Sequence, residues 1–163
     1  MGGLDGVVSL MRARPMINPT CRLSIRRRPI HFVRQRFMAA SEDQIAEIEC
    51  RFGVRLPDDY RRFLLTRGSM SEFLPPADSY VQIGPIDDVI PVNKAGDIQR
   101  RFPGALVIGS DGSREMLAYD FRQCQSRLVL LDLTAQDWSD AVYQASSLAA
   151  LLAQLPERGW LFD

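Results

Sequence analysis

Residues 105–121 have the sequence ALVIGSDGSREMLAYDF, in which two apolar runs flank the dipeptide Asp111-Gly112. Because glycine accepts the positive φ that a tight chain reversal requires, this stretch predicts a β-hairpin. A third apolar run, residues 127–133, follows after a short polar loop, and residues 80–84 are another strand candidate because of their β-branched and aromatic side chains. The expected sheet is therefore an antiparallel meander of four or more strands.

Helices are predicted on both sides of these strands in the sequence. Ser41 and Gln44 have the spacing of a capping box, apolar residues follow at helical intervals, and Gly53 ends the run. Pro57, followed by two aspartates, starts a second helix that stops at Gly68. Leucines at i, i+3, i+4 and i+7 near the C-terminus predict a last helix. The expected fold class is α+β, with the sheet faced by an N-terminal helical hairpin and a C-terminal helix.

The segments between these elements carry weaker patterns. Residues 69–79 include the pair Pro75-Pro76 and are predicted to form a loop. Residues 85–93 contain two prolines six positions apart, which break any long element and favour an edge segment or a short turn. Residues 97–102 are expected to form a short helix.

Charge is divided unevenly along a chain whose formal net charge is zero. Residues 1–40 carry a net charge of +7 and residues 41–163 carry −7. We therefore predict a basic, Arg-rich N-terminal extension at residues 1–40 and an α+β domain at residues 41–163. The extension has four open interpretations: a nucleic-acid-binding arm, a flexible solvated tail, a targeting segment, or sequence upstream of a start at Met38.

The chain has neither a signal-peptide pattern nor an apolar run of 18 residues, so we expect neither secretion nor a membrane partner. Its cysteines are odd in number, widely spaced and without a C-x-x-C motif, and are predicted to be reduced, buried thiols: Cys21, Cys50 and Cys124. Such cysteines are typical of a cytoplasmic protein. A chain of 163 residues can also bury a core without a metal or a disulfide.

Residues that could carry out catalysis are sparse. His31 is the only histidine, so a Ser-His-Asp triad or a zinc site has too few candidate ligands. Paired carboxylates occur at residues 58–59 and 87–88, but a helix N-terminus and a turn explain them. Residues 109–113 lack the lysine and the following helix of a phosphate loop. The sequence therefore predicts a protein that is not an enzyme, with no catalytic residues, no cofactor and no metal.

Several short motifs follow one another between residues 41 and 155. They are Phe52-Gly53, Leu56-Pro57-Asp58-Asp59-Tyr60, Gly68, Phe102-Pro103-Gly104, Ile108-Gly109-Ser110-Asp111-Gly112 and, in the closing helix, residues 147–152. In their order and spacing they resemble the SUKH superfamily, which comprises fungal cell-wall assembly regulators and bacterial immunity proteins. The resemblance implies an α+β fold, no enzymatic activity and, in bacterial members, binding and neutralisation of a toxin, often a nuclease.

An acidic domain attracts a basic partner, so we expect a protein partner, namely a basic toxin domain, and we do not expect nucleic acid. The candidate contact residues are seven carboxylates and two apolar anchors: Asp58, Asp59, Asp87, Asp88, Asp111, Glu115, Asp120, Phe73 and Leu74. Two alternative functions stay open. One is a regulatory scaffold in signalling or cell-envelope assembly, and the other is nucleic-acid binding through the Arg-rich extension.

Overall fold

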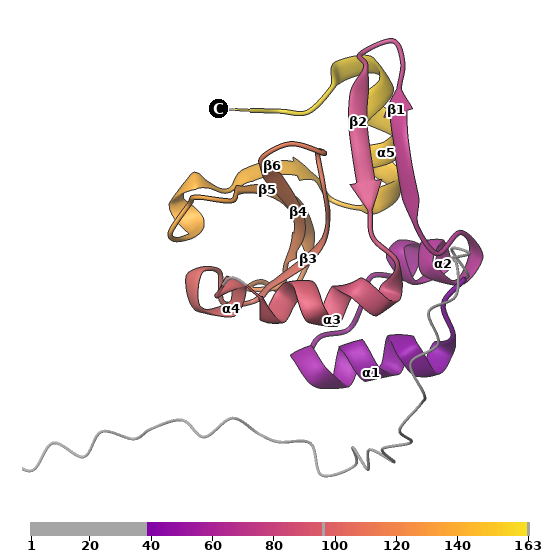
Figure 1. Ribbon diagram of the computed structural model, residues 1–163, viewed down its shortest axis with the longest axis vertical. Coiled ribbons are helices and arrows are strands. Elements are labelled where there is room, and N and C mark those ends of the chain that lie inside the picture. The colour runs from indigo at the N-terminus through magenta and orange to yellow at the C-terminus, as the bar shows by residue number, and fades with distance from the viewer. Residues whose placement is uncertain (1–38, 96, 163) are drawn as a thin grey trace, which may run out of the picture. The chain divides into compact units, whose positions relative to one another are not determined.

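The computed structural model describes residues 39–95 and 97–162. Within them, six antiparallel strands pair in the order β1-β2-β3-β4-β5-β6, which confirms the predicted meander (Figure 1). The strands are β1 (Met70–Leu74), β2 (Ser79–Ile83), β3 (Ala105–Ser110), β4 (Glu115–Asp120), β5 (Arg127–Asp132) and β6 (Val142–Ala145). The predicted N-terminal extension lies outside the described residues, apart from its last two.

The helices confirm the predicted α+β class. They are α1 (Glu42–Phe52), α2 (Asp58–Thr66), α3 (Ile86–Lys94), α4 (Ile98–Arg101), α5 (Leu148–Arg158) and a short 3-10 helix, η1 (Trp138–Asp140). The capping box of α1 is formed: the Gln44 amide donates to Ser41 Oγ at 3.2 Å, and the Ser41 amide donates to Gln44 Oε1 at 2.9 Å. Gly53 then ends the helix with a φ of 65°. At α5, the hydroxyl of Ser147 accepts a hydrogen bond from the third helical amide.

The predicted loop at residues 69–79 is wrong, because it contains β1, a turn and the first residue of β2. The register of β1 against β2 runs from Met70↔Ile83 to Leu74↔Ser79. Three consecutive side chains of β1 are exposed. An edge strand of this kind lacks the alternation of buried and exposed residues by which sequence analysis finds strands.

The predicted edge segment or turn at residues 85–93 is also wrong, because this part of the chain is α3. Pro85 stands before the first helical turn, where no amide hydrogen is needed, and Pro91 lies on the exposed side of the helix. The buried side chain of Asn93 holds the helix on β3, since it donates to the carbonyl of Val107 and accepts from its amide, both at 2.7 Å. Tertiary packing thus outweighs the hydrogen bond that Pro91 removes from the helix.

Apolar side chains pack on both faces of the sheet. Helices α1, α2, α3 and α5 supply residues to the larger cluster, which includes Leu106 and Leu117. Helix α4 and η1 supply residues to the smaller cluster, which includes Val107 and Ala118. Successive residues of one strand enter different clusters because strand side chains alternate between the faces.

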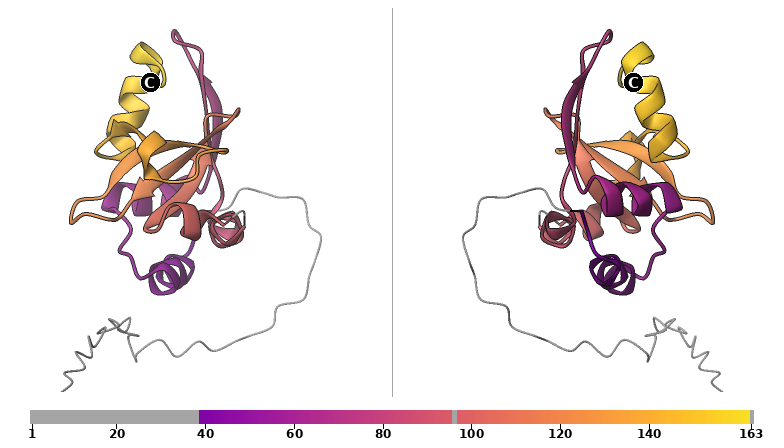
Figure 2. Two further views of the ribbon diagram at one scale, coloured as in Figure 1. Left: turned by 90° about the vertical axis from the view of Figure 1, so that its left-hand side faces the viewer. Right: turned by 90° about the vertical axis from the view of Figure 1, so that its right-hand side faces the viewer.

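The C-terminal helix lies beside the β1–β2 hairpin (Figure 2). The indole of Trp160 donates to the carbonyl of Tyr80 at 2.8 Å. The buried amide of Gln144 in β6 bonds both backbone groups of Leu161, donating to the carbonyl at 2.8 Å and accepting from the amide at 3.1 Å. The residues after α5 therefore connect the first hairpin of the sheet to its last strand.

The predicted buried, reduced thiols are wrong for two cysteines. Cys124 is a free thiol but is exposed in the loop between β4 and β5. Cys50 is exposed on α1 and disulfide-bonded, so it gives no support to a reducing compartment. Cys21 lies outside the described residues. No helix in the described ranges is long and apolar enough to cross a membrane.

Candidate functional site

A pocket of about 160 Å³ lies between α3 and the adjoining ends of β2 and β3. We call it the α3 pocket. Its lining combines four apolar residues with three polar ones and two glycines: Val89, Val92, Val107, Ile108, Gln82, Asp88, Ser110, Gly84 and Gly109.

The α3 pocket exists because β2 separates from β3 after a short pairing. Only Gln82↔Ser110 and Ile83↔Gly109 form the register between these strands, and a β-bulge interrupts β3 next to Gly109. A Cβ on Gly109 would lie 1.9 Å from the carbonyl oxygen of Gln82. Glycine is therefore required where the two backbones approach. Gly109 and Gln82, which make this close approach, both line the pocket.

An aromatic surface adjoins the pocket along the hairpin. The rings of Phe73 and Tyr80 are 4.9 Å apart, and the hydroxyls of Tyr80 and Ser71 lie 2.6 Å apart. Alternation along β2 puts Tyr80 and Gln82 on one face, and Gln82 lines the pocket. Tyr80 also lies against Gly112, where an added Cβ would be 2.1 Å from the ring. Phe73, Tyr80 and Ser71, which we call the aromatic face, thus continue into the α3 pocket and border the β3–β4 turn.

Carboxylates flank both ends of this region. Asp87 and Asp88 are exposed in the first turn of α3, and Asp87 accepts a hydrogen bond from Gln44 at 2.7 Å. Asp111 lies in the β3–β4 turn, where it accepts from the amides of Ser113 and Glu115. No ion pair joins any of Asp87, Asp88, Asp111 or Glu115 to another described residue. We call these four carboxylates the acidic rim.

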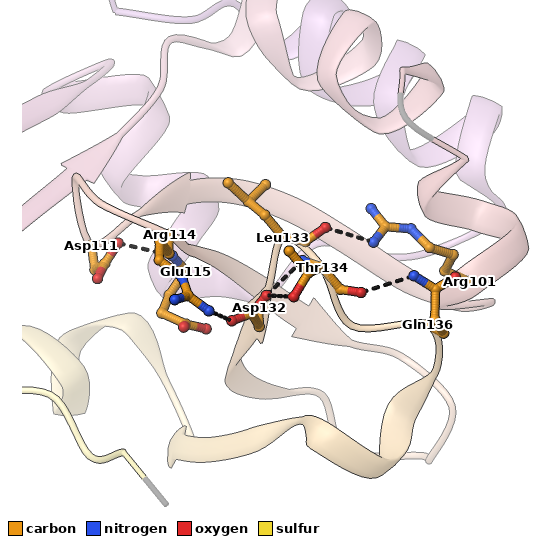
Figure 3. A network of polar contacts seen from close by, with 8 residues as sticks. All are labelled: Arg101, Asp111, Arg114, Glu115, Asp132, Leu133, Thr134 and Gln136. Atoms are coloured by element: carbon orange, nitrogen blue, oxygen red, sulfur yellow. Dashed lines mark hydrogen bonds and ion pairs between the residues drawn. The ribbon is translucent and has the colours of Figure 1, made fainter.

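The β3–β4 turn brings like charges together (Figure 3). Glu115 stands opposite Asp132 in the register of β4 and β5. Burial raises the pKa of Glu115, and the charges of Asp132 and Asp111 raise it further. Hydrogen bonds from Thr134, and one from Arg114 at 2.5 Å, hold the pKa of Asp132 well below its usual value. Arg114 therefore pairs with Asp132, and its charge only partly offsets the rise in the pKa of Glu115.

The other predicted contact residues lie elsewhere. Asp58 is exposed at the start of α2, and Asp59 accepts a hydrogen bond from the amide of Ala149 at the start of α5. Leu74 is partly buried against the larger core cluster. Asp120 requires a correction, because it is 1% exposed and bound by two arginines, so a partner cannot reach it. The structure thus brings together five of the nine residues: Phe73, Asp87, Asp88, Asp111 and Glu115.

Sequence analysis missed the residues that give this region its shape. Tyr80 was predicted only as part of a strand, and Val92 only as part of an edge segment or a short turn. Gln82 and Ser110 carry no sequence signal, since their place in the pocket depends on the contact between α3 and β3. An amphipathic pattern in residues 86–93 could have placed α3, but the two prolines concealed it.

The chemistry available in the α3 pocket is recognition by hydrogen bonds and charge. It contains one carboxylate, one amide and one hydroxyl beside an apolar wall. In residues 39–95 and 97–162, no group of three or more His, Cys, Asp or Glu side chains could hold a metal ion. A few polar groups beside apolar walls are typical of a binding site.

Comparison with known proteins agrees with this architecture. No curated protein matches the sequence. A family model, described as the SMI1 / KNR4 family (SUKH-1), matches residues 39–154, which include every strand of the sheet, the α3 pocket and most of α5. Because this match covers well over half of the sequence, the chain belongs to the SMI1 / KNR4 family (SUKH-1).

Proposed function

We propose that the chain is a non-enzymatic immunity protein that binds a basic toxin domain and neutralises it by covering it. The observation that carries the proposal is the acidic rim: four carboxylates without ion pairs among the described residues, beside an exposed aromatic side chain. Phe73 is 69% exposed, and an exposed aromatic side chain beside charged groups is a typical anchor of a protein interface.

Some carboxylates outside the acidic rim are paired, whereas others, such as the exposed residues Asp58, Asp137 and Asp140, are also without an ion pair among the described residues. Glu49 contacts Arg61 at 2.9 Å, and Asp97 contacts Arg100 at 3.0 Å. Such pairs cancel much of the local charge, whereas the acidic rim keeps its negative potential. A partner with lysines and arginines would therefore be attracted to this side of the domain.

Electrostatic attraction between the acidic rim and a basic partner affects the rate of association. Charges at the edge of an interface act mainly on the association rate, and salt screens them over about 8 Å at physiological ionic strength. Aromatic anchors such as Phe73 instead contribute to the lifetime of the complex. We therefore expect association that slows strongly as salt is added and dissociation that changes little.

The test is affinity capture from the source cells with the full chain, followed by co-expression of the captured protein and measurement of growth. The decisive variant replaces Asp87, Asp88 and Asp111 by asparagine, and its matched control makes the same change at the exposed residues Asp58, Asp137 and Asp140. Both variants lose three charges. We expect only the variant at Asp87, Asp88 and Asp111 to stop protecting growth against the captured protein. We also expect Phe73→Ala to weaken binding about tenfold.

Three results would contradict the proposal. The first is a captured protein that does not inhibit growth when it is expressed alone. The second is equal loss of protection in the two triple variants, which would reduce the effect to net charge. The third is capture of several weak partners without toxicity, which would favour a regulatory scaffold instead.

A further inference from the structure

We infer that the α3 pocket receives one arginine side chain of the partner, with its guanidinium against the carboxylate of Asp88. This inference deepens the proposed function, on which it depends for the partner being a protein. Three properties of the pocket favour an arginine side chain: its volume, its apolar lining and its unpaired carboxylate.

The volume limits what can enter. Pockets for cofactors and drug-sized ligands measure about 300–1,000 Å³. The α3 pocket, at about 160 Å³, is too small for them. It is suitable for a single long side chain that projects from a protein surface, as the anchor residues of protein interfaces do.

The wall selects an amphipathic side chain. The lining includes three buried apolar residues, Val89, Val107 and Ile108, and Val92, which has 43% of its surface exposed. The polar groups come from Gln82, Asp88 and Ser110. Arginine and lysine combine an apolar stem with a cationic head, so either side chain could place the stem along the valines and the head at the polar end.

The carboxylate of Asp88 then selects the charge of the head group. Within the described ranges it forms neither a hydrogen bond nor an ion pair, and the nearby side chains of the pocket provide no cation. An anionic ligand would be repelled by Asp88 and by the rest of the acidic rim. A cation would instead gain a charge-assisted hydrogen bond to Asp88.

The number of acceptors favours arginine over lysine. The carboxylate of Asp88, the amide oxygen of Gln82 and the hydroxyl of Ser110 can all accept hydrogen bonds. A guanidinium has five N–H donors in a fixed plane, whereas an ammonium has three on a single atom. Asn93 fixes α3 on β3 through its two hydrogen bonds to Val107, so the acceptors on the helix and the strand keep their spacing.

The test is an NMR titration of the full chain with acetyl-Gly-Arg-Gly-amide, followed through backbone amide shifts. The matched peptides carry citrulline, which has nearly the same shape without the charge, or lysine. We expect saturable shifts at Gln82, Asp88 and Ser110, with affinity for the arginine peptide about tenfold above that for the citrulline peptide.

Two variants localise the effect. Asp88→Asn removes the proposed partner of the guanidinium and is expected to lower the affinity about tenfold. Asp58→Asn removes the same charge at an exposed residue outside the pocket and the acidic rim, and is expected to leave the affinity unchanged. Val92→Trp places a larger side chain in the lining of the pocket without altering charge and should abolish the shifts.

Equal binding of the arginine and citrulline peptides would overturn the inference, as would equal loss in the Asp58 and Asp88 variants. Lysine binding as tightly as arginine would overturn the choice of arginine. These failures are separable from failure of the proposed function, because the titration needs no toxin. If the peptides do not bind while the triple rim variant still loses protection, only the arginine site is wrong.

Discussion

Asp120 and Asp88 belong to the same acidic domain, but their surroundings are opposite. Asp120 is 1% exposed and accepts hydrogen bonds from Arg122 at 2.9 Å and from Arg127 at 3.3 Å. Burial alone would raise the pKa of Asp120, but these hydrogen bonds outweigh it and lower the pKa. Asp88 is exposed, and its carboxylate has no such partner among the described residues. Water satisfies Asp88 in the free protein.

The difference separates structure from recognition. A carboxylate that leaves water must be compensated inside the protein, so Asp120 is paired whether or not a partner exists. A carboxylate that stays in water needs no compensation and remains available to a cation from outside. Pairing therefore indicates which acidic residues hold the fold together and which ones form the surface.

The largest effect on stability is expected from a substitution that removes the pocket beside Asp88, and it is the strongest test of the contrast between Asp88 and Asp120. Gly109→Ala places a Cβ 1.9 Å from the carbonyl oxygen of Gln82 and should lower the free energy of unfolding by about 3 kcal/mol. Gly84→Ala is the matched control, because its Cβ would meet only ordinary contacts at 3.8 and 3.9 Å. We expect it to change stability by less than about 1 kcal/mol. Chemical denaturation measures both, and equal effects would contradict the close approach.

The second largest effect on stability is expected from loss of the buried carboxylate of Asp120. Asp120→Ala leaves Arg122 and Arg127 without their partner and should lower the free energy of unfolding by about 2 kcal/mol at neutral pH. The pKa of Asp120 is lowered in the folded protein. The ionised carboxylate therefore contributes to stability at pH values above the ordinary aspartate pKa near 3.8, and this contribution is lost as the pH falls through the folded-state pKa. The deficit should therefore shrink in acid. Asp140→Ala, at an exposed site, should cost less than about 0.5 kcal/mol.

A smaller effect of opposite sign is expected at the β3–β4 turn. Glu115→Gln removes a charge that faces Asp132 across the strands and should stabilise the protein by about 0.5 kcal/mol at neutral pH. The raised pKa of Glu115 means that stability is lost as the pH rises through the folded-state pKa, which lies above the ordinary value near 4.5. Glutamine has no proton to lose, so the gain should vanish in acid. Denaturation curves at several pH values check this, and a gain that persists at low pH would refute the charge explanation.

The smallest effect on stability is expected at Asp88 itself. Asp88→Asn should change the free energy of unfolding by less than about 0.5 kcal/mol, because the carboxylate bonds no described residue. Thermal unfolding measures the change. A loss as large as that of Asp120→Ala would show that Asp88 stabilises the fold, and it would remove the contrast between the two aspartates.

Much of the fold was predictable because its signals are local. The capping box at Ser41, the Asp111-Gly112 turn and the leucines of α5 each act within a few residues of the chain. Strand β1 and helix α3 were not predicted, because their stability comes from contacts with distant segments. The two hydrogen bonds between Asn93 and Val107 are an example, since they join residues that a pattern analysis treats as unrelated.

In the candidate site, too, some residues could be proposed from local sequence while others depend on contacts between distant segments. Charge and hydropathy led to Asp88, Asp111 and Phe73 as candidate contact residues, which stay predictions. Charge and hydropathy were not enough to exclude Asp120, because its burial and its arginine partners depend on the pairing of β4 with β5. The α3 pocket was beyond prediction for the same reason, since it forms where a misassigned helix meets β3.

The C-terminal connection described above has a consequence for the folding pathway. Strands β3, β4, β5 and β6 pair in chain order across connections of fewer than ten residues, so this part of the sheet can form at a low cost in chain entropy. The bond from Trp160 to Tyr80 instead spans 80 residues, and the bond from Ala149 to Asp59 spans 90. We therefore expect the meander to form early and α5 to dock after the rate-limiting step, so that substitutions at Trp160 accelerate unfolding more than they slow folding.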